Sequence, residues 1–168
     1  MNANLLGIGA DLAVNASILV DASQAPGLLI TNGEFTAFHS DTWLPNSKVE
    51  STHVKVTNSN AGPVKFTTSS FWGPSSQVAD IGGSGAVSFE NCQFVEWDEQ
   101  AKDGRAAIRT SSAEASVIVS SSTFAQAKRQ VDVSAGASNL IFTSNIVEGK
   151  CNISGKAARH IVASNACD

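Results

Sequence analysis

The sequence predicts an all-β solenoid, a single domain of stacked coils over residues 1–168. Three observations predict it: one strand pattern recurs along the chain, Ser, Ala, Asn, Thr, Val and Gly dominate the composition, and charged residues make up only 15%. These residue types favour short strands joined by tight turns over amphipathic helices. With 42% hydrophobic residues, a chain of 168 residues is long enough to bury a substantial core.

The strand pattern is eight residues long. Each copy has two apolar residues two positions apart, then small polar residues, then an apolar anchor. The copies are LLITNGEF (28–35), VKFTTSSF (64–71), VSFENCQF (87–94), VIVSSSTF (117–124), LIFTSNIV (140–147) and a degenerate HIVASNAC (160–167). The anchors Phe35, Phe71, Phe94, Phe124, Val147 and Cys167 are 36, 23, 30, 23 and 20 residues apart. Constant strands with variable spacing indicate insertions confined to particular turns.

A second, shorter strand precedes most copies, at residues 78–81, 106–109, 131–134 and 151–154, and residues 18–27 play this part before the first copy. A β-sandwich would also contain many short strands, but it need not repeat one anchor. In a solenoid the anchor rings stack into the core, and the small polar position before each anchor forms a hydrogen-bonding ladder. We therefore expect burial of Phe66, Phe71, Phe89, Phe94, Phe124 and Phe142.

The repeat GxVSFENCxFxxW (85–97), with its polar ladder and Phe stacks, resembles the right-handed parallel β-helix of pectate-lyase-like proteins. This superfamily includes polygalacturonases and related polysaccharide-cleaving enzymes. The resemblance covers nearly the whole chain, but the capping segment FGAxGDGxxDDT and the catalytic set NTD…DD…GHG are absent. It implies a single β-helix of about five or six coils, a shortened relative or the C-terminal coils of a larger one. It also implies a polysaccharide as partner and a secreted or cell-surface location.

The segments after the anchors are expected to emerge along one edge, because equivalent positions of successive coils stack. All three tryptophans lie in these segments, and a Trp face can stack on a sugar ring. The alternative is that the tryptophans cover the core laterally. The edge carries His39, Asp41, Trp43, Trp72, Glu96, Trp97, Asp98, Lys128, Arg129, Glu148 and Lys150. His39, beside Asp41, is a candidate general base or a loop histidine bonded to solvent.

Two carboxylate pairs are catalytic candidates. Glu96 and Asp98 lie two apart and would share one face of an extended strand, or they belong to a solvated acidic loop. Asp80 and Asp132 occupy outward positions two coils apart, about 9.6 Å at the usual strand spacing, with Arg109 between them. Arg109 would bind an acidic sugar or balance the charge of the pair.

The first functional hypothesis is hydrolysis of a polysaccharide by paired carboxylates. A second is β-elimination of a uronate, with Arg109, Lys128 or Arg129 as base or charge-binding group. A third, from another class, is a non-catalytic coil: a polysaccharide-binding module, an adhesin or tail-spike segment, or the remnant of a larger enzyme. We expect no cofactor.

The remaining features limit the partners. A net charge of −4 argues against nucleic acid and anionic membranes, and no apolar run approaches the length of a membrane span. Residues 1–20 lack the pattern of a signal peptide. The cysteines have no CxxC spacing, so we expect no metal; at most one disulfide forms, and Cys92 and Cys151 are expected to be free buried thiols. Open coil ends, at residues 1–30 or near Asp168, favour a homo-oligomer.

Overall fold

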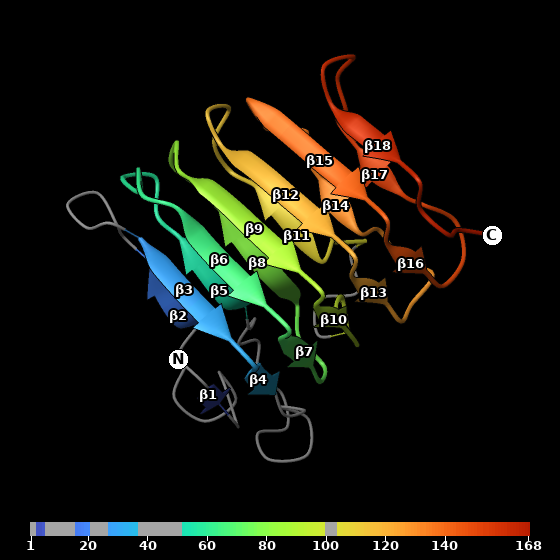
Figure 1. Ribbon diagram of the computed structural model, residues 1–168, viewed down its shortest axis with the longest axis horizontal. Coiled ribbons are helices and arrows are strands. Elements are labelled where there is room, and N and C mark those ends of the chain that lie inside the picture. The colour runs from blue at the N-terminus through green and yellow to red at the C-terminus, as the bar shows by residue number, and fades with distance from the viewer. Residues whose placement is uncertain (1–2, 6–15, 21–26, 37–51, 100–103) are drawn as a thin grey trace.

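The computed structural model describes residues 3–5, 16–20, 27–36, 52–99 and 104–168. Within these ranges the chain forms strands and no helix, so none of the described segments is a helix that could span a membrane. The strands fall into three sheets of six, and each sheet takes every third strand along the chain (Figure 1). All strand pairings are parallel, as the β-helix prediction requires.

Sheet A contains β1 (Ala3–Leu5), β4 (Gly33–Thr36), β7 (Ser70–Trp72), β10 (Gln93–Phe94), β13 (Thr123–Phe124) and β16 (Ile146–Val147). Sheet B contains β2 (Ala16–Val20), β5 (Thr52–Val56), β8 (Gln77–Ile81), β11 (Ile108–Thr110), β14 (Val131–Asp132) and β17 (Ile153–Ser154). Sheet C contains β3 (Leu28–Thr31), β6 (Val64–Thr67), β9 (Ala86–Glu90), β12 (Ser116–Ser120), β15 (Asn139–Thr143) and β18 (Ile161–Ala163).

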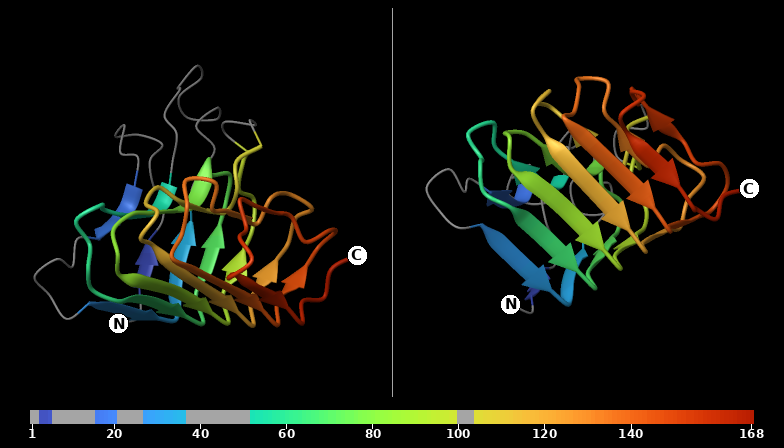
Figure 2. Two further views of the ribbon diagram at one scale, coloured as in Figure 1. Left: turned by 90° about the horizontal axis from the view of Figure 1, so that it is seen from above. Right: turned by 45° about the horizontal axis from the view of Figure 1, so that its top comes forward.

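The chain passes from sheet B to sheet C to sheet A and then enters the next coil (Figure 2). The result is a right-handed parallel β-helix of about six coils, which confirms the predicted fold class. The coils have three strands rather than the two expected from the sequence. Each eight-residue copy spans two sheets, because it bends in its middle.

The bend is produced by one residue with left-handed backbone geometry in every copy. Its φ lies between 49° and 58°, and it turns the chain from sheet C into sheet A within two residues. Asn and Ser adopt this conformation more readily than bulky residues do, because their short polar side chains bond locally. The six residues are Asn32, Thr68, Asn91, Ser121, Ser144 and Ser164.

Aromatic rings fill the interior in two columns. All six phenylalanines expected in the core are 0% exposed, and so is Phe35. The anchor rings of sheet A stack nearly parallel: Phe35 on Phe71 at 4.8 Å, Phe71 on Phe94 at 5.5 Å, and Phe94 on Phe124 at 4.4 Å between centroids. The sheet C rings Phe66 and Phe89 stack at 5.2 Å and meet the anchors edge-on. The predicted Phe column is confirmed.

A ladder of small residues lies beside the aromatic columns, two positions before each anchor. Its side chains accept backbone N–H groups of the preceding coil at 2.9–3.1 Å, which satisfies polar groups that would otherwise be buried unpaired. The donor and acceptor pairs are Gly33 with Ser69, Cys92 with Ser122, Ser122 with Asn145, and Asn145 with Asn165. The expected ladder is therefore present.

The cysteines divide differently from the expectation. Cys92 is a free, buried thiol, as predicted, and burial raises its pKa to about 11, so it is unreactive at neutral pH. Cys151 was also expected to be free, and this was wrong: it is bonded to Cys167, with the two Cα atoms 5.5 Å apart. Cys151 comes just before β17 and Cys167 stands at the anchor position of the sixth copy, so the last coil brings them together.

Reduction of this disulfide should loosen the last coil first. The bond closes the segment that contains β17 and β18, each of which has a paired neighbour on one side only. We expect a reductant to increase amide hydrogen exchange in β17 and β18 while β8, β9 and β12 keep their protection, and Cys151→Ser should reproduce the effect. Unchanged exchange in β17 and β18 after verified reduction would contradict this.

Candidate functional site

On the outer face of sheet B the register stacks the charged residues Lys55, Asp80, Arg109 and Asp132, and we call the last three the charged column. The strand register pairs Asp80 with Arg109 and Arg109 with Asp132, as the sequence predicted. Their neighbours Ala79 and Ile108 point inward and are 0% exposed, because side chains alternate along a strand. The column is therefore held on three adjacent, hydrogen-bonded strands.

The charges of this column are paired in a defined way. Arg109 Nη2 donates to Asp80 Oδ2 at 2.9 Å, and this hydrogen bond raises the pKa of Arg109 above its ordinary value. Burial acts to raise the pKa of Asp132, but hydrogen bonds from Ser134 and the charge of Arg129, 3.7 Å away, outweigh it and lower that pKa. Asp132 is thus ionised and Arg109 protonated at neutral pH.

A pocket of about 240 Å³ opens beside the column, and we call it the arginine pocket. Three of its seven lining residues are arginines, which come from the turn before β11, from β11 itself and from the turn before β14. Asp80 Oδ1 and Arg129 Nε are enclosed near it without a protein hydrogen-bond partner. The lining residues are Gln77, Gly104, Arg105, Ala106, Arg109, Arg129 and Asp132.

Trp97 does not lie on the surface. Its side chain is 0% exposed, its ring meets Phe124 edge-on at 5.9 Å, and its Nε1 donates to the carbonyl oxygen of Arg129 at 2.9 Å. This placement corrects the expectation that Trp97 offers a platform to a sugar, and it matches the alternative that a tryptophan covers the core laterally. Trp97 instead fixes the backbone of Arg129, a residue that lines the arginine pocket.

Glu96 and Asp98 do not lie in an extended strand, which corrects the geometric reason for pairing them. Both residues have φ of 57°, so the segment folds into tight turns, held by backbone hydrogen bonds from Ser75 to Glu96 and from Glu99 to Ser75. Asp98 is 7% exposed, and its Oδ2 accepts the N–H of Gly104, a pocket residue, at 3.1 Å. Asp98 therefore positions the rim of the arginine pocket.

The other predicted site residues are dispersed. Lys128 is bound to the carboxylate of Glu99 and donates to the carbonyl oxygen of Trp97 at 3.0 Å. Trp72 is 47% exposed on the outer face of sheet A, away from the charged column of sheet B. Glu148 and Lys150 are exposed in the turn after β16. His39, Asp41 and Trp43 lie outside the described residues.

Sequence reasoning missed Arg105. The segment DGRAAIR, between the anchors Phe94 and Phe124, places Arg105 and Arg109 four residues apart, and this spacing is the signal that would have found Arg105. Gln77, at the start of β8, was missed because nothing in its sequence context distinguishes it. Both residues line the arginine pocket.

Within the described part of the chain, no three His, Cys, Asp or Glu residues gather in a way that could hold a metal ion. Comparison of the sequence and fold with family models, curated proteins and solved structures finds no match. The fold and the site together define a parallel β-helix protein with an arginine-lined pocket on one sheet.

Proposed function

We propose that this protein binds an anionic polysaccharide, such as a polymer of uronic acids, in the arginine pocket of sheet B. The observation that carries the proposal is the convergence of three arginines, Arg105, Arg109 and Arg129, on one pocket of a chain whose net charge is −4. A guanidinium presents parallel N–H donors that match both oxygens of a carboxylate. A cluster of positive side chains on a protein whose net charge is negative favours an anionic ligand.

The two carboxylates complement this role. Asp80 holds Arg109 in place on the sheet through the 2.9 Å hydrogen bond, so the guanidinium is oriented before a ligand arrives. Asp132 is ionised and partly exposed, and it can accept hydrogen bonds from sugar hydroxyls. The turn that contains Trp97 and Asp98 holds the backbone of two pocket residues. Trp97 donates to the carbonyl oxygen of Arg129, and Asp98 accepts the N–H of Gly104.

Binding without cleavage is favoured over the two catalytic hypotheses. Hydrolysis by Asp80 and Asp132 needs one of them to act as a protonated acid, whereas Asp80 is hydrogen-bonded to the cation of Arg109 at 2.9 Å and the pKa of Asp132 is lowered. Elimination needs a base, whereas the raised pKa of Arg109 keeps it protonated. Hydrolysis by Glu96 and Asp98 remains a prediction, with Asp98 bonded to a backbone N–H.

The proposal is compatible with the resemblance of the repeat to pectate-lyase-like proteins. Under it, this chain binds polysaccharide without cleaving it. It also implies that the protein is located where polysaccharide occurs, outside the cell or at its surface. The disulfide between Cys151 and Cys167 supports this, because disulfides persist in oxidising compartments.

Titration calorimetry with polygalacturonate, alginate and hyaluronan tests the proposal. We expect at least one polymer to bind, affinity to fall as salt is raised, and Arg105→Gln or Arg129→Gln to weaken it about tenfold each. Lys156→Gln is the matched control, since it removes one exposed cation from the turn after β17.

Two readouts can overturn the proposal. If all three polymers fail to bind, or if Lys156→Gln weakens binding as much as the arginine variants do, the arginine pocket is not the site. Release of reducing ends, or of an unsaturated uronate product, would show cleavage. Loss of that activity in Glu96→Gln or Asp98→Asn would then assign hydrolysis to that pair.

A further inference from the structure

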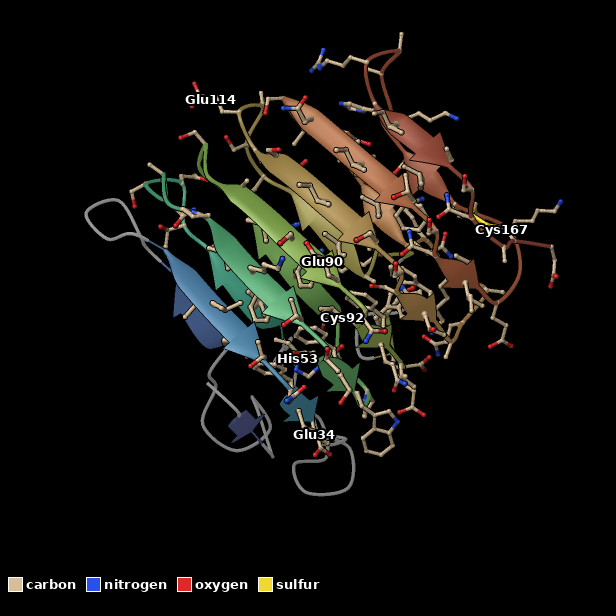
Figure 3. The ribbon with its side chains drawn as sticks, in the orientation of Figure 1. Glu34, His53, Glu90, Cys92, Glu114 and Cys167 are labelled. Carbon is tan, nitrogen blue, oxygen red and sulfur yellow. A yellow bond between two sulfur atoms is a disulfide. The ribbon has the colours of Figure 1, made fainter. Side chains whose placement is uncertain are left out.

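A second cavity, which the proposed function does not use, lies at the bend between sheets C and A. It has a volume of about 380 Å³ and follows the bend between sheets C and A over four coils. We call it the sheet A groove. Its lining residues are Asn32, Gly33, Glu34, Thr68, Ser69, Ser70, Asn91, Cys92, Gln93 and Thr123. Figure 3 labels Glu34 beside β4 and Cys92 near β10, at two places along it.

The groove is built from three rows of the repeat. The buried ladder residues Gly33, Ser69 and Cys92 form its floor. One wall consists of the left-handed residues Asn32, Thr68 and Asn91, all exposed. The other wall consists of the outward side chains of sheet A, Glu34, Ser70, Gln93 and Thr123, which the strand register places in one column.

The chemistry of the walls fits an uncharged sugar chain. Amide and hydroxyl groups donate and accept hydrogen bonds, and so do the hydroxyls of a sugar. Glu34 is the only ionisable side chain exposed among the lining residues, and no cation lines the groove, so an anionic polymer finds no partner there. The rows recur once per coil, about 4.8 Å apart, and this spacing suits an extended ligand with a short repeat.

An aromatic ring stands on the same face. Trp72 is two residues after Ser70 on β7, and Phe71 between them points inward, so Trp72 and Ser70 both project outward, about 7 Å apart along the strand. The side chain of Trp72 is 47% exposed, so its ring is accessible to a ligand. Its ring can stack on a pyranose while the groove binds the neighbouring units.

We propose that the sheet A groove, together with the ring of Trp72, is a second carbohydrate site that binds an uncharged, extended oligosaccharide. The site is independent of the arginine pocket: it lies on a different sheet, shares no lining residue with it and takes a neutral ligand rather than an anionic one. The protein would thus hold a neutral chain on sheet A and an anionic chain on sheet B.

The test is titration calorimetry of the whole protein with cellohexaose, xylohexaose and mannohexaose. We expect at least one of them to bind with an affinity that is insensitive to salt, because no ion pair is involved. Trp72→Ala should weaken binding at least about tenfold, as expected for the loss of a stacking ring. Gln93→Lys should weaken it as strongly, by placing a long charged side chain in the groove.

The matched control is Ile146→Lys. Ile146 occupies the same outward position of the coil as Gln93 and is 60% exposed, but it does not line the groove, so this variant should bind like the wild type. Failure of all three hexasaccharides to bind would overturn the proposal. So would equal loss in Gln93→Lys and Ile146→Lys, or competition by polygalacturonate, which would place the neutral sugar in the arginine pocket.

Discussion

Replacing Phe94 with alanine should lower the free energy of unfolding by about 3–5 kcal/mol. The ring of Phe94 is 0% exposed and lies between Phe71 and Phe124, with Phe89 meeting it edge-on at 5.6 Å. The neighbouring backbones are fixed by parallel pairing to the coils on both sides, so they cannot collapse into the space that the ring leaves. The cavity left by the ring therefore stays open, and most of the loss in unfolding free energy remains.

Urea unfolding followed by circular dichroism measures this loss. Ile146→Ala is the control, because Ile146 belongs to the same sheet but is 60% exposed, and its truncation should change stability by less than about 0.5 kcal/mol. A loss below about 1 kcal/mol in Phe94→Ala would show that the aromatic column does not carry the core.

Acidification should begin to destabilise the protein near pH 6.5, before most carboxylates titrate. His53, on β5, is 1% exposed, packs against Phe71 at 6.0 Å, and has no hydrogen-bond partner at either ring nitrogen in the described part of the chain. Burial lowers its pKa from 6.5 to about 4. The folded protein thus keeps this imidazole neutral where the unfolded chain already protonates it.

The direction of the effect follows from proton uptake. Below pH 6.5 His53 binds a proton in the unfolded state but not in the folded state. The free energy of unfolding therefore falls as the pH is lowered, until the folded pKa near 4 is reached. A difference of this size is worth about 3 kcal/mol in total. His53→Leu should remove this part of the slope between pH 6.5 and 4, whereas His160→Gln, in the turn before β18, should keep it. Parallel stability curves for the wild type and His53→Leu would contradict the prediction.

The repeat was predictable from the sequence because large apolar side chains recur at a fixed position of each copy. Phe35, Phe71, Phe94 and Phe124 recur at the same place in each copy, and the column of Asp80, Arg109 and Asp132 follows from the same alignment. The third sheet was not predictable in this way. Several of its strands, such as β10 and β13, are only two residues long, and the left-handed residue that separates them from sheet C is an ordinary Asn, Ser or Thr.

The candidate site was predictable in part, since its details depend on contacts between coils. Trp97 turns inward because the carbonyl oxygen of Arg129, in the next coil, accepts its indole N–H. Cys151 pairs with Cys167 because the last coil is short enough to bring them together. The local sequence around Trp97 and Cys151 contains neither partner, so periodicity alone could not reveal these contacts.

The unequal turns of the helix have a consequence for evolution and engineering. Residues 37–51 connect β4 to β5 and only residues 73–76 connect β7 to β8, yet the strands on both sides keep their register. New peptide segments can therefore be grafted at this corner without disturbing the layers beneath. Gln77, which lines the arginine pocket, directly follows residues 73–76, so loop exchange at this corner can alter ligand preference while the stacked rings of the core are kept.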